Sequence, residues 1–145
     1  MNKIINKIII LCSVFLILLT GCSKKFDWDK TVNKLIDMRF DEVTRYETKV
    51  QVDVLNNLSN SLIDYYGGNF TIELNRAIYL VRNYRYDQGE CKLYEFKTKS
   101  QAKQFVEFYI EIRSKDSSYK YAIENNIVVR SNHDIAMNVI GLDFK

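Results

Sequence analysis

The side chains that most often perform catalysis are scarce in this 145-residue chain. His133 is the only histidine, which excludes a zinc site built from several histidines and leaves Cys91 with His133 as the available Cys/His pair. The sequence contains no glycine-rich phosphate loop and no Gly-x-Ser-x-Gly motif. Any two of the 18 acidic residues could form a carboxylate pair for glycoside hydrolysis, but the sequence singles out none. We therefore expect no catalytic residues, no metal site and no bound cofactor.

The strongest candidate for recognition is the segment YLVRNYRY, residues 79–86. Its candidate binding residues are Tyr79, Arg82, Tyr84, Arg85 and Tyr86. Tyrosine and arginine provide rigid contact area and forked hydrogen-bond donors, which suit a sugar or a peptide. Tyrosine is also a favoured strand residue, so these side chains could instead stabilise a sheet. Strand alternation places Arg82, Tyr84 and Tyr86 on one face and Tyr79 and Arg85 on the other.

The N-terminal segment has the pattern of an export signal. Lys3 and Lys7 precede a run of 12 uncharged residues, 8–19, and the small residues Thr20 and Gly21 follow. A helix that crosses a bilayer needs roughly 17–25 apolar residues. The run is shorter than that, so it indicates a signal peptide and not a membrane-spanning helix.

The sequence Leu19-Thr20-Gly21-Cys22 resembles the lipobox of bacterial lipoproteins. The resemblance implies that residues 1–21 are removed as a signal peptide and that the Cys22 thiol carries a diacylglyceryl group. Two acyl chains hold a protein firmly on a membrane. Residues 22–27 would then form a short lipidated tether, and residues 28–145 a domain at the extracytoplasmic face of the bacterial cell membrane.

Charge and cysteine usage narrow the possibilities further. Loss of Lys3 and Lys7 lowers the net charge from +3 to about +1, which argues against nucleic acid as a partner. Cys12 would leave with the signal peptide and Cys22 would carry lipid, so Cys91 would stand alone. We expect Cys91 to pack in the core as a small hydrophobic residue. A reactive thiol or an intermolecular disulfide remain alternatives.

Hydrophobic periodicity predicts a single α+β domain. The expected helices cover residues 28–36, 48–66, 98–112 and 133–140, and the expected strands cover residues 41–47, 70–74, 77–86, 90–97, 119–123 and 127–130. A folded part of this size builds one core. The order of elements predicts a mostly antiparallel sheet with the helices packed on one face.

Three local expectations accompany this fold. The second helix carries an apolar stripe that should be buried against the sheet, formed by Val50, Val54, Leu55, Leu58 and Leu62. Gly89, in the segment 87–89, should supply the turn between two strands. Asn132 could cap the last helix, which would leave His133 on the surface near the start of that helix.

Three classes of function fit these observations. The first is a non-catalytic, lipid-anchored accessory protein of the envelope, whose partners are the membrane lipid at Cys22 and another envelope protein. The second is a small ligand-binding lipoprotein with a pocket between sheet and helices, and the third is an envelope hydrolase. An exposed aromatic patch without a cavity would favour the first, a closed apolar pocket the second, and titratable groups that converge in a cleft the third.

Overall fold

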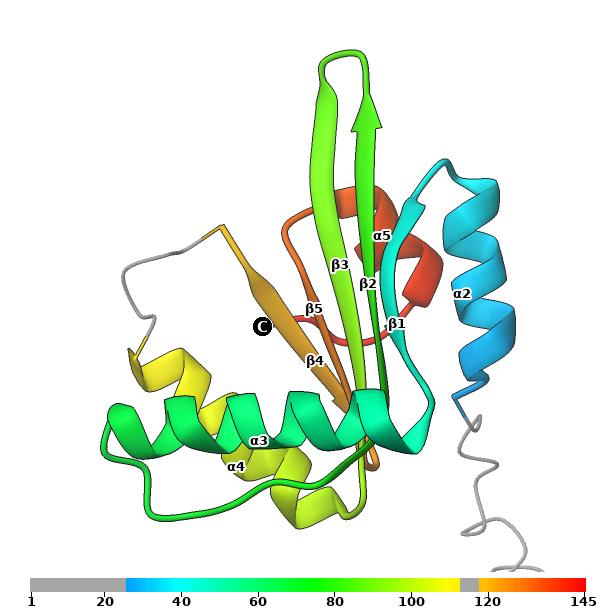
Figure 1. Ribbon diagram of the computed structural model, residues 1–145. Coiled ribbons are helices and arrows are strands. Elements are labelled where there is room, and N and C mark those ends of the chain that lie inside the picture. Colours follow the sequence, from blue (N-terminus) through cyan, green and yellow to red (C-terminus); the bar gives the residue numbers. More distant parts are fainter. Residues whose placement is uncertain (1–25, 113–117) are drawn as a thin grey trace, which may run out of the picture.

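The computed structural model describes residues 26–112 and 118–145. The predicted signal peptide, the lipobox and Cys22 lie outside the described residues. The helices are α2 (Trp28–Asp37), α3 (Lys49–Tyr65), α4 (Lys99–Ile112) and α5 (Asp134–Ile140). The strands are β1 (Asp41–Tyr46), β2 (Leu74–Tyr84), β3 (Asp87–Phe96), β4 (Lys120–Glu124) and β5 (Ile127–Ser131). They form one antiparallel sheet in the order β1-β2-β3-β5-β4, which confirms a single α+β domain (Figure 1).

Helices lie on both faces of this sheet, which corrects the expectation that they pack on one face. One core cluster joins α2 and α5 to Leu80 and Leu93, and the other joins α3 and α4 to Phe96 and Val128. The physical reason is visible in β5, where every residue is buried. Successive strand residues point to opposite faces, so a continuously apolar strand needs a cover on each side.

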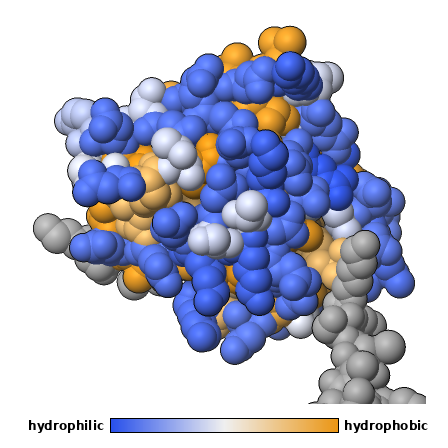
Figure 2. All heavy atoms as spheres, turned by 90° about the horizontal axis from the view of Figure 1, so that it is seen from below, coloured by the Kyte–Doolittle hydropathy of each residue, from blue (hydrophilic) through white to orange (hydrophobic). Residues whose placement is uncertain are grey.

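The two pairs of helices cover different parts of the sheet. α3 and α4 cross one end of it, and the β2–β3 hairpin extends well beyond them (Figure 1). Seen from the α3 and α4 end, the surface is mostly hydrophilic, with smaller apolar areas between polar side chains (Figure 2). The sheet face on the α3 side is therefore only partly covered, and the extended part of the hairpin is open.

The turn of the β2–β3 hairpin lies two residues earlier than expected. Tyr84 pairs with Asp87, so Arg85 and Tyr86 form a two-residue turn, with Arg85 at φ 54°. Gly89 is a strand residue that allows a close approach: a Cβ atom there would lie 2.6 Å from Cδ2 of His133. The glycine is thus explained by a contact with a distant segment and not by the turn.

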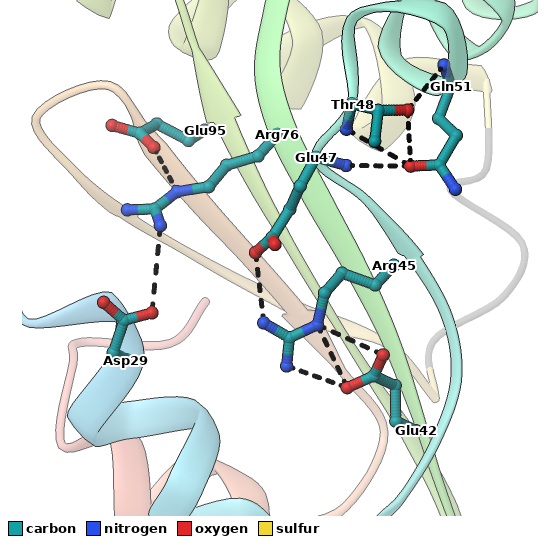
Figure 3. A network of polar contacts seen from close by, with 8 residues as sticks. All are labelled: Asp29, Glu42, Arg45, Glu47, Thr48, Gln51, Arg76 and Glu95. Atoms are coloured by element: carbon teal, nitrogen blue, oxygen red, sulfur yellow. Dashed lines mark hydrogen bonds and ion pairs between the residues drawn. The ribbon is translucent and has the colours of Figure 1, made fainter.

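The start of α3 is fixed by a network of polar contacts beside the edge strand β1 (Figure 3). Oγ1 of Thr48 accepts a hydrogen bond from the Gln51 backbone at 3.4 Å, and Oε1 of Gln51 accepts one from the Thr48 backbone at 3.2 Å, which forms a capping box. Arg45 pairs with Glu42 at 2.8 Å and with Glu47 at 3.0 Å. Such charged side chains protect an edge strand from pairing with other chains.

The orientation of α3 is opposite to the expected one. Asn60 hydrogen-bonds both the backbone N–H and the backbone C=O of Ile72, at 2.8 and 3.0 Å, and Asn56 accepts from the N–H of Leu74 at 2.8 Å. These bonds turn part of the polar side of α3 inward. The segment 70–73, expected to be a strand, has no strand pairing and lies against α3 through these bonds. Most of the apolar stripe of α3 is consequently exposed.

Candidate functional site

The structure does not bring the five candidate binding residues together. Tyr79 belongs to the face of β2 that looks toward α3, whereas Arg82 and Tyr84 belong to the opposite face. Arg85 and Tyr86 form the hairpin turn, and Tyr86 is fully exposed. A single tyrosine and arginine patch is therefore absent from this hairpin, and the two faces need separate description.

On the α2 side, Arg82 is part of a structural cluster. Its Nε donates to Oδ2 of Asp87 at 2.7 Å, and its Nη1 donates to the Met38 carbonyl. Asp87 also pairs with Nε2 of His133 at 2.6 Å. The hydrogen bonds from His133 and Arg82 hold the pKa of the Asp87 carboxyl below its usual value. The cluster ties the hairpin to the segment after α2 and to the start of α5.

His133 is buried and caps α5, which corrects two expectations. Its Nδ1 accepts from the backbone N–H of Ile135 at 3.2 Å, so Nε2 carries the proton and donates to Asp87. Both ring nitrogens are therefore engaged in hydrogen bonds within the fold. Asn132 does not cap the helix: its Oδ1 accepts from the backbone N–H of Glu90 at 2.7 Å.

On the other face, five side chains form what we call the Glu90 cluster: Tyr79, Glu90, Lys92, Tyr119 and Arg130. The Tyr79 hydroxyl donates to Oε2 of Glu90 at 2.6 Å, and the Tyr119 hydroxyl donates to Oε1. Lys92 and Arg130 lie 3.7 and 3.9 Å from Oε1. The two cations also stack on the two rings, with Lys92 4.3 Å from the Tyr79 centroid and Arg130 3.6 Å from the Tyr119 centroid.

The electrostatics of the Glu90 cluster favour an ionised carboxylate. Burial raises the pKa of Glu90, but the hydrogen bonds from Tyr119 and Tyr79 and the charges of Lys92 and Arg130 outweigh burial and bring that pKa below its usual value. The hydrogen bond to Glu90, together with burial, raises the pKa of Tyr79 to about 12. At neutral pH the carboxylate is therefore charged and the Tyr79 hydroxyl is a fixed donor.

An open groove of about 510 Å³ runs beside this cluster. The residues that line it are Tyr79, Val81, Arg82, Asn83, Gln88, Gly89, Glu90, Tyr119 and Asn132. They come from the extended part of the β2–β3 hairpin, the residue before β4 and the residue after β5, beyond the end of the sheet that α3 and α4 cross (Figure 1). We call this cavity the hairpin groove. Its walls are rich in amides and hydroxyls, so it can offer many hydrogen bonds.

A smaller hollow of about 160 Å³ lies between α3 and the sheet. Leu55 lines it from α3, and Tyr46, Tyr79 and Tyr94 are among the strand residues opposite. Ligand pockets for small molecules usually measure about 300–1,000 Å³. The hollow is therefore small for an organic ligand.

Cys91 has a structural position in the core. Cys91 is fully buried, which confirms the expectation of core packing, and burial raises the pKa of its thiol to about 12. Within residues 26–112 and 118–145 there is no group of three or more potential metal ligands. In the same part of the chain, none of the helices combines the length and apolar character required to cross a membrane.

Sequence reasoning missed Glu90, Lys92, Tyr119 and Arg130 as one site. The signal that could have indicated part of it is the alternation along β3, where Glu90 and Lys92 alternate with the buried Cys91 and Leu93. That pattern predicts a strand face without a helix above it. The pairing of Lys92 with Arg130 depends on the β3–β5 register, which the sequence does not reveal.

Comparisons with protein-family models, with curated proteins and with solved structures found no match to this chain.

Proposed function

We propose that this protein is a lipid-anchored, non-catalytic accessory protein of the bacterial envelope that binds a partner protein in the hairpin groove. The observation that carries the binding part is the preformed Glu90 cluster beside an open cavity of about 510 Å³. The anchoring part rests on the lipobox resemblance at residues 19–22. A domain tethered at Cys22 would be held at the membrane surface, within reach of other envelope proteins.

The chemistry of the groove supports binding over catalysis. Glycoside hydrolysis needs two carboxyl groups, one of them with a raised pKa. Among residues 26–112 and 118–145, Glu90 is the only carboxylate that lines the groove, and its pKa is lowered. Because the pKa of Tyr79 is raised, its hydroxyl stays protonated at neutral pH and the tyrosinate form that could act as a base is scarcely populated. These groups hold one another in place, which suits a rigid recognition surface.

The lining also indicates the chemistry of the partner. Asn83, Gln88 and Asn132 offer amide donors and acceptors along the groove, and Val81 is its main aliphatic residue. Such a surface suits a polar segment of a protein better than an acyl chain or another apolar ligand. The alternative function, binding of a small ligand between sheet and helices, is less favoured because the hollow beside Leu55 measures only about 160 Å³.

Anchoring can be tested with two cysteine variants. In cells fed a clickable fatty acid, the wild-type chain and Cys91→Ser should be labelled and should be found in the membrane fraction. Cys22→Ser should lose both the label and the membrane location. Cys91→Ser is the matched control, because Cys91 is a buried cysteine of the same chain. Labelling that persists in Cys22→Ser would contradict the anchor.

Binding in the groove can be tested by photo-crosslinking in intact cells. A photoreactive residue at Asn83, which is exposed and lines the groove, should give a discrete adduct. The same residue at Lys34, exposed on α2, is the control and should not give it. Glu90→Gln should reduce the Asn83 adduct, since it removes the central charge of the cluster. Equal adducts from both positions, or an adduct that Glu90→Gln leaves unchanged, would refute binding in the groove.

A further inference from the structure

The outward side of α3 carries a continuous apolar stripe. Its residues, with their exposed fractions, are Val50 (73%), Val54 (60%), Leu58 (58%), Leu62 (40%) and Tyr65 (80%). The first four are spaced by four residues, so they form one ridge along the helix. Isolated exposed apolar residues are ordinary, but an aligned set of this length marks an interaction site.

The stripe is held outward by specific bonds. Asn56 and Asn60 make three hydrogen bonds of 2.8–3.0 Å to the backbone of Ile72 and Leu74, on the opposite side of the helix. The capping box at Thr48 fixes the first turn. Rotation of α3 to bury its stripe against the sheet would break these bonds and leave the buried backbone of Ile72 unpaired. Within the part of the chain that the structure describes, α3 therefore cannot turn to bury the stripe.

The charges of α3 argue against a lipid surface as the occupant. The helix has one lysine, Lys49, and two aspartates, Asp53 and Asp64. At about 100° per residue, all three lie outside the arc that the stripe occupies. Helices that bind an anionic membrane surface are rich in lysine and arginine on their polar face. A weakly acidic helix with an uncharged stripe better fits another uncharged protein surface.

We infer that the stripe of α3 is a self-association surface on which two copies of this chain pack α3 against α3. A ridge of residues spaced by four fits between the matching ridges of an identical helix, in the commonest class of helix packing. A twofold axis that crosses the stripe midway between Val54 and Leu58 would place Val54 of one copy against Leu58 of the other, and Val50 against Leu62. The contact requires no charge complement, because the same uncharged ridge serves both copies.

The size of the contact sets its expected strength. A 17-residue helix is about 25 Å long and about 10 Å wide, so α3 alone covers a few hundred Å² per copy. Stable interfaces cover about 800 Å² per partner. The dimer should therefore be weak in dilute solution and favoured where copies are concentrated. Confinement by the proposed Cys22 anchor would supply such a concentration, and only this part of the inference rests on the proposed function.

The test is disulfide crosslinking between two differently tagged full-length chains in the same cells. Val54→Cys in one chain and Leu58→Cys in the other should give a mixed dimer on mild oxidation, because the two positions face each other. Asp53→Cys paired with Leu58→Cys is the control: Asp53 is also exposed but lies off the stripe. A Val50→Glu substitution added to both chains should reduce the mixed dimer several-fold.

Each other outcome overturns the inference. No mixed dimer, or an equal yield with Asp53→Cys, excludes specific α3 pairing. If Leu58→Cys forms an adduct with a different protein, the stripe binds that protein. If the chain floats with phospholipid vesicles in a Leu58-dependent way and forms no mixed dimer, the stripe binds lipid. Fractionation of the same cells reports the anchor separately, so a failed anchor and a failed dimer are distinguishable.

Discussion

Gly89→Ala tests the central packing contact between the hairpin and α5. An alanine Cβ at this position would lie 2.6, 2.8 and 3.0 Å from Cδ2, Cβ and Cγ of His133, closer than such atoms pack. His133 cannot easily move, because its ring bonds both Asp87 and the backbone of Ile135. The substitution must therefore distort the β3 strand or displace the cap of α5.

The expected size of the effect follows from two opposing terms. Overpacking of a core typically costs about 1–3 kcal/mol. Replacement of a glycine by alanine without a clash stabilises a protein by about 0.4–1 kcal/mol through the unfolded state. The net loss in the free energy of unfolding should be about 0.5–2 kcal/mol. For roughly 120 folded residues, this lowers the melting temperature by about 2–8 °C.

The assay is urea and thermal unfolding of Gly89→Ala and of the same change in a His133→Gly background. His133→Gly removes all three contacting atoms, and glycine is tolerated at a helix N-cap. In that background Gly89→Ala should be neutral or stabilising, so the double-mutant cycle should show coupling of about 1–3 kcal/mol. A Gly89→Ala protein that is more stable than wild type, or coupling near zero, would refute the packing argument.

Four further results are expected. Because the pKa of Glu90 is lowered in the folded state, its carboxylate stabilises the fold above the ordinary glutamate pKa, and this stabilisation is lost as the pH falls. The urea concentration at the unfolding midpoint should therefore decrease when the pH is lowered below about 4.3, and it should decrease less in Glu90→Gln. Tyr79 has a raised pKa of about 12, so wild-type stability should fall as the pH rises above about 10, and Tyr79→Phe should reduce this fall. Cys91 should react with a maleimide only after denaturation, as mass spectrometry would show. Asn60→Ala removes both bonds to the Ile72 backbone and should cost about 2–4 kcal/mol in urea unfolding.

The parts of the fold that the sequence predicted depend on local signals. The α4 helix follows a Thr98 cap that accepts from the Gln101 backbone at 3.2 Å, and its stripe buries Ala102, Phe105 and Val106. The paired strands were predicted from segments of strand-forming residues, because such a segment can be recognised without knowledge of its pairing register. These elements were predictable because each is specified by residues that lie close together in the sequence.

The predictions were wrong where the role of a residue depends on a contact with a distant segment of the chain. Gly89 resembles a turn glycine, but its missing side chain makes room for His133, 44 positions away. Arg85 takes the positive φ of the turn without a glycine. The Glu90 cluster likewise unites β2, β3, β5 and the residue before β4, and its pairing depends on register. Local pattern alone could not find such contacts.

The α3 helix shows what hydrophobic periodicity does and does not predict. Spacing by four residues shows that Val50, Val54, Leu58 and Leu62 share one side of a helix, but it does not say what covers that side. The segment 70–73 has no strand pairing. The backbone N–H and C=O of Ile72 instead pair with the Asn60 side chain, and the backbone N–H of Leu74 donates to Asn56. Because these backbone groups need hydrogen-bond partners, Asn56 and Asn60 face inward and the apolar stripe faces outward. Under the proposed pairing of α3 with α3, the stripe is buried after all, against a second copy of the chain instead of the sheet.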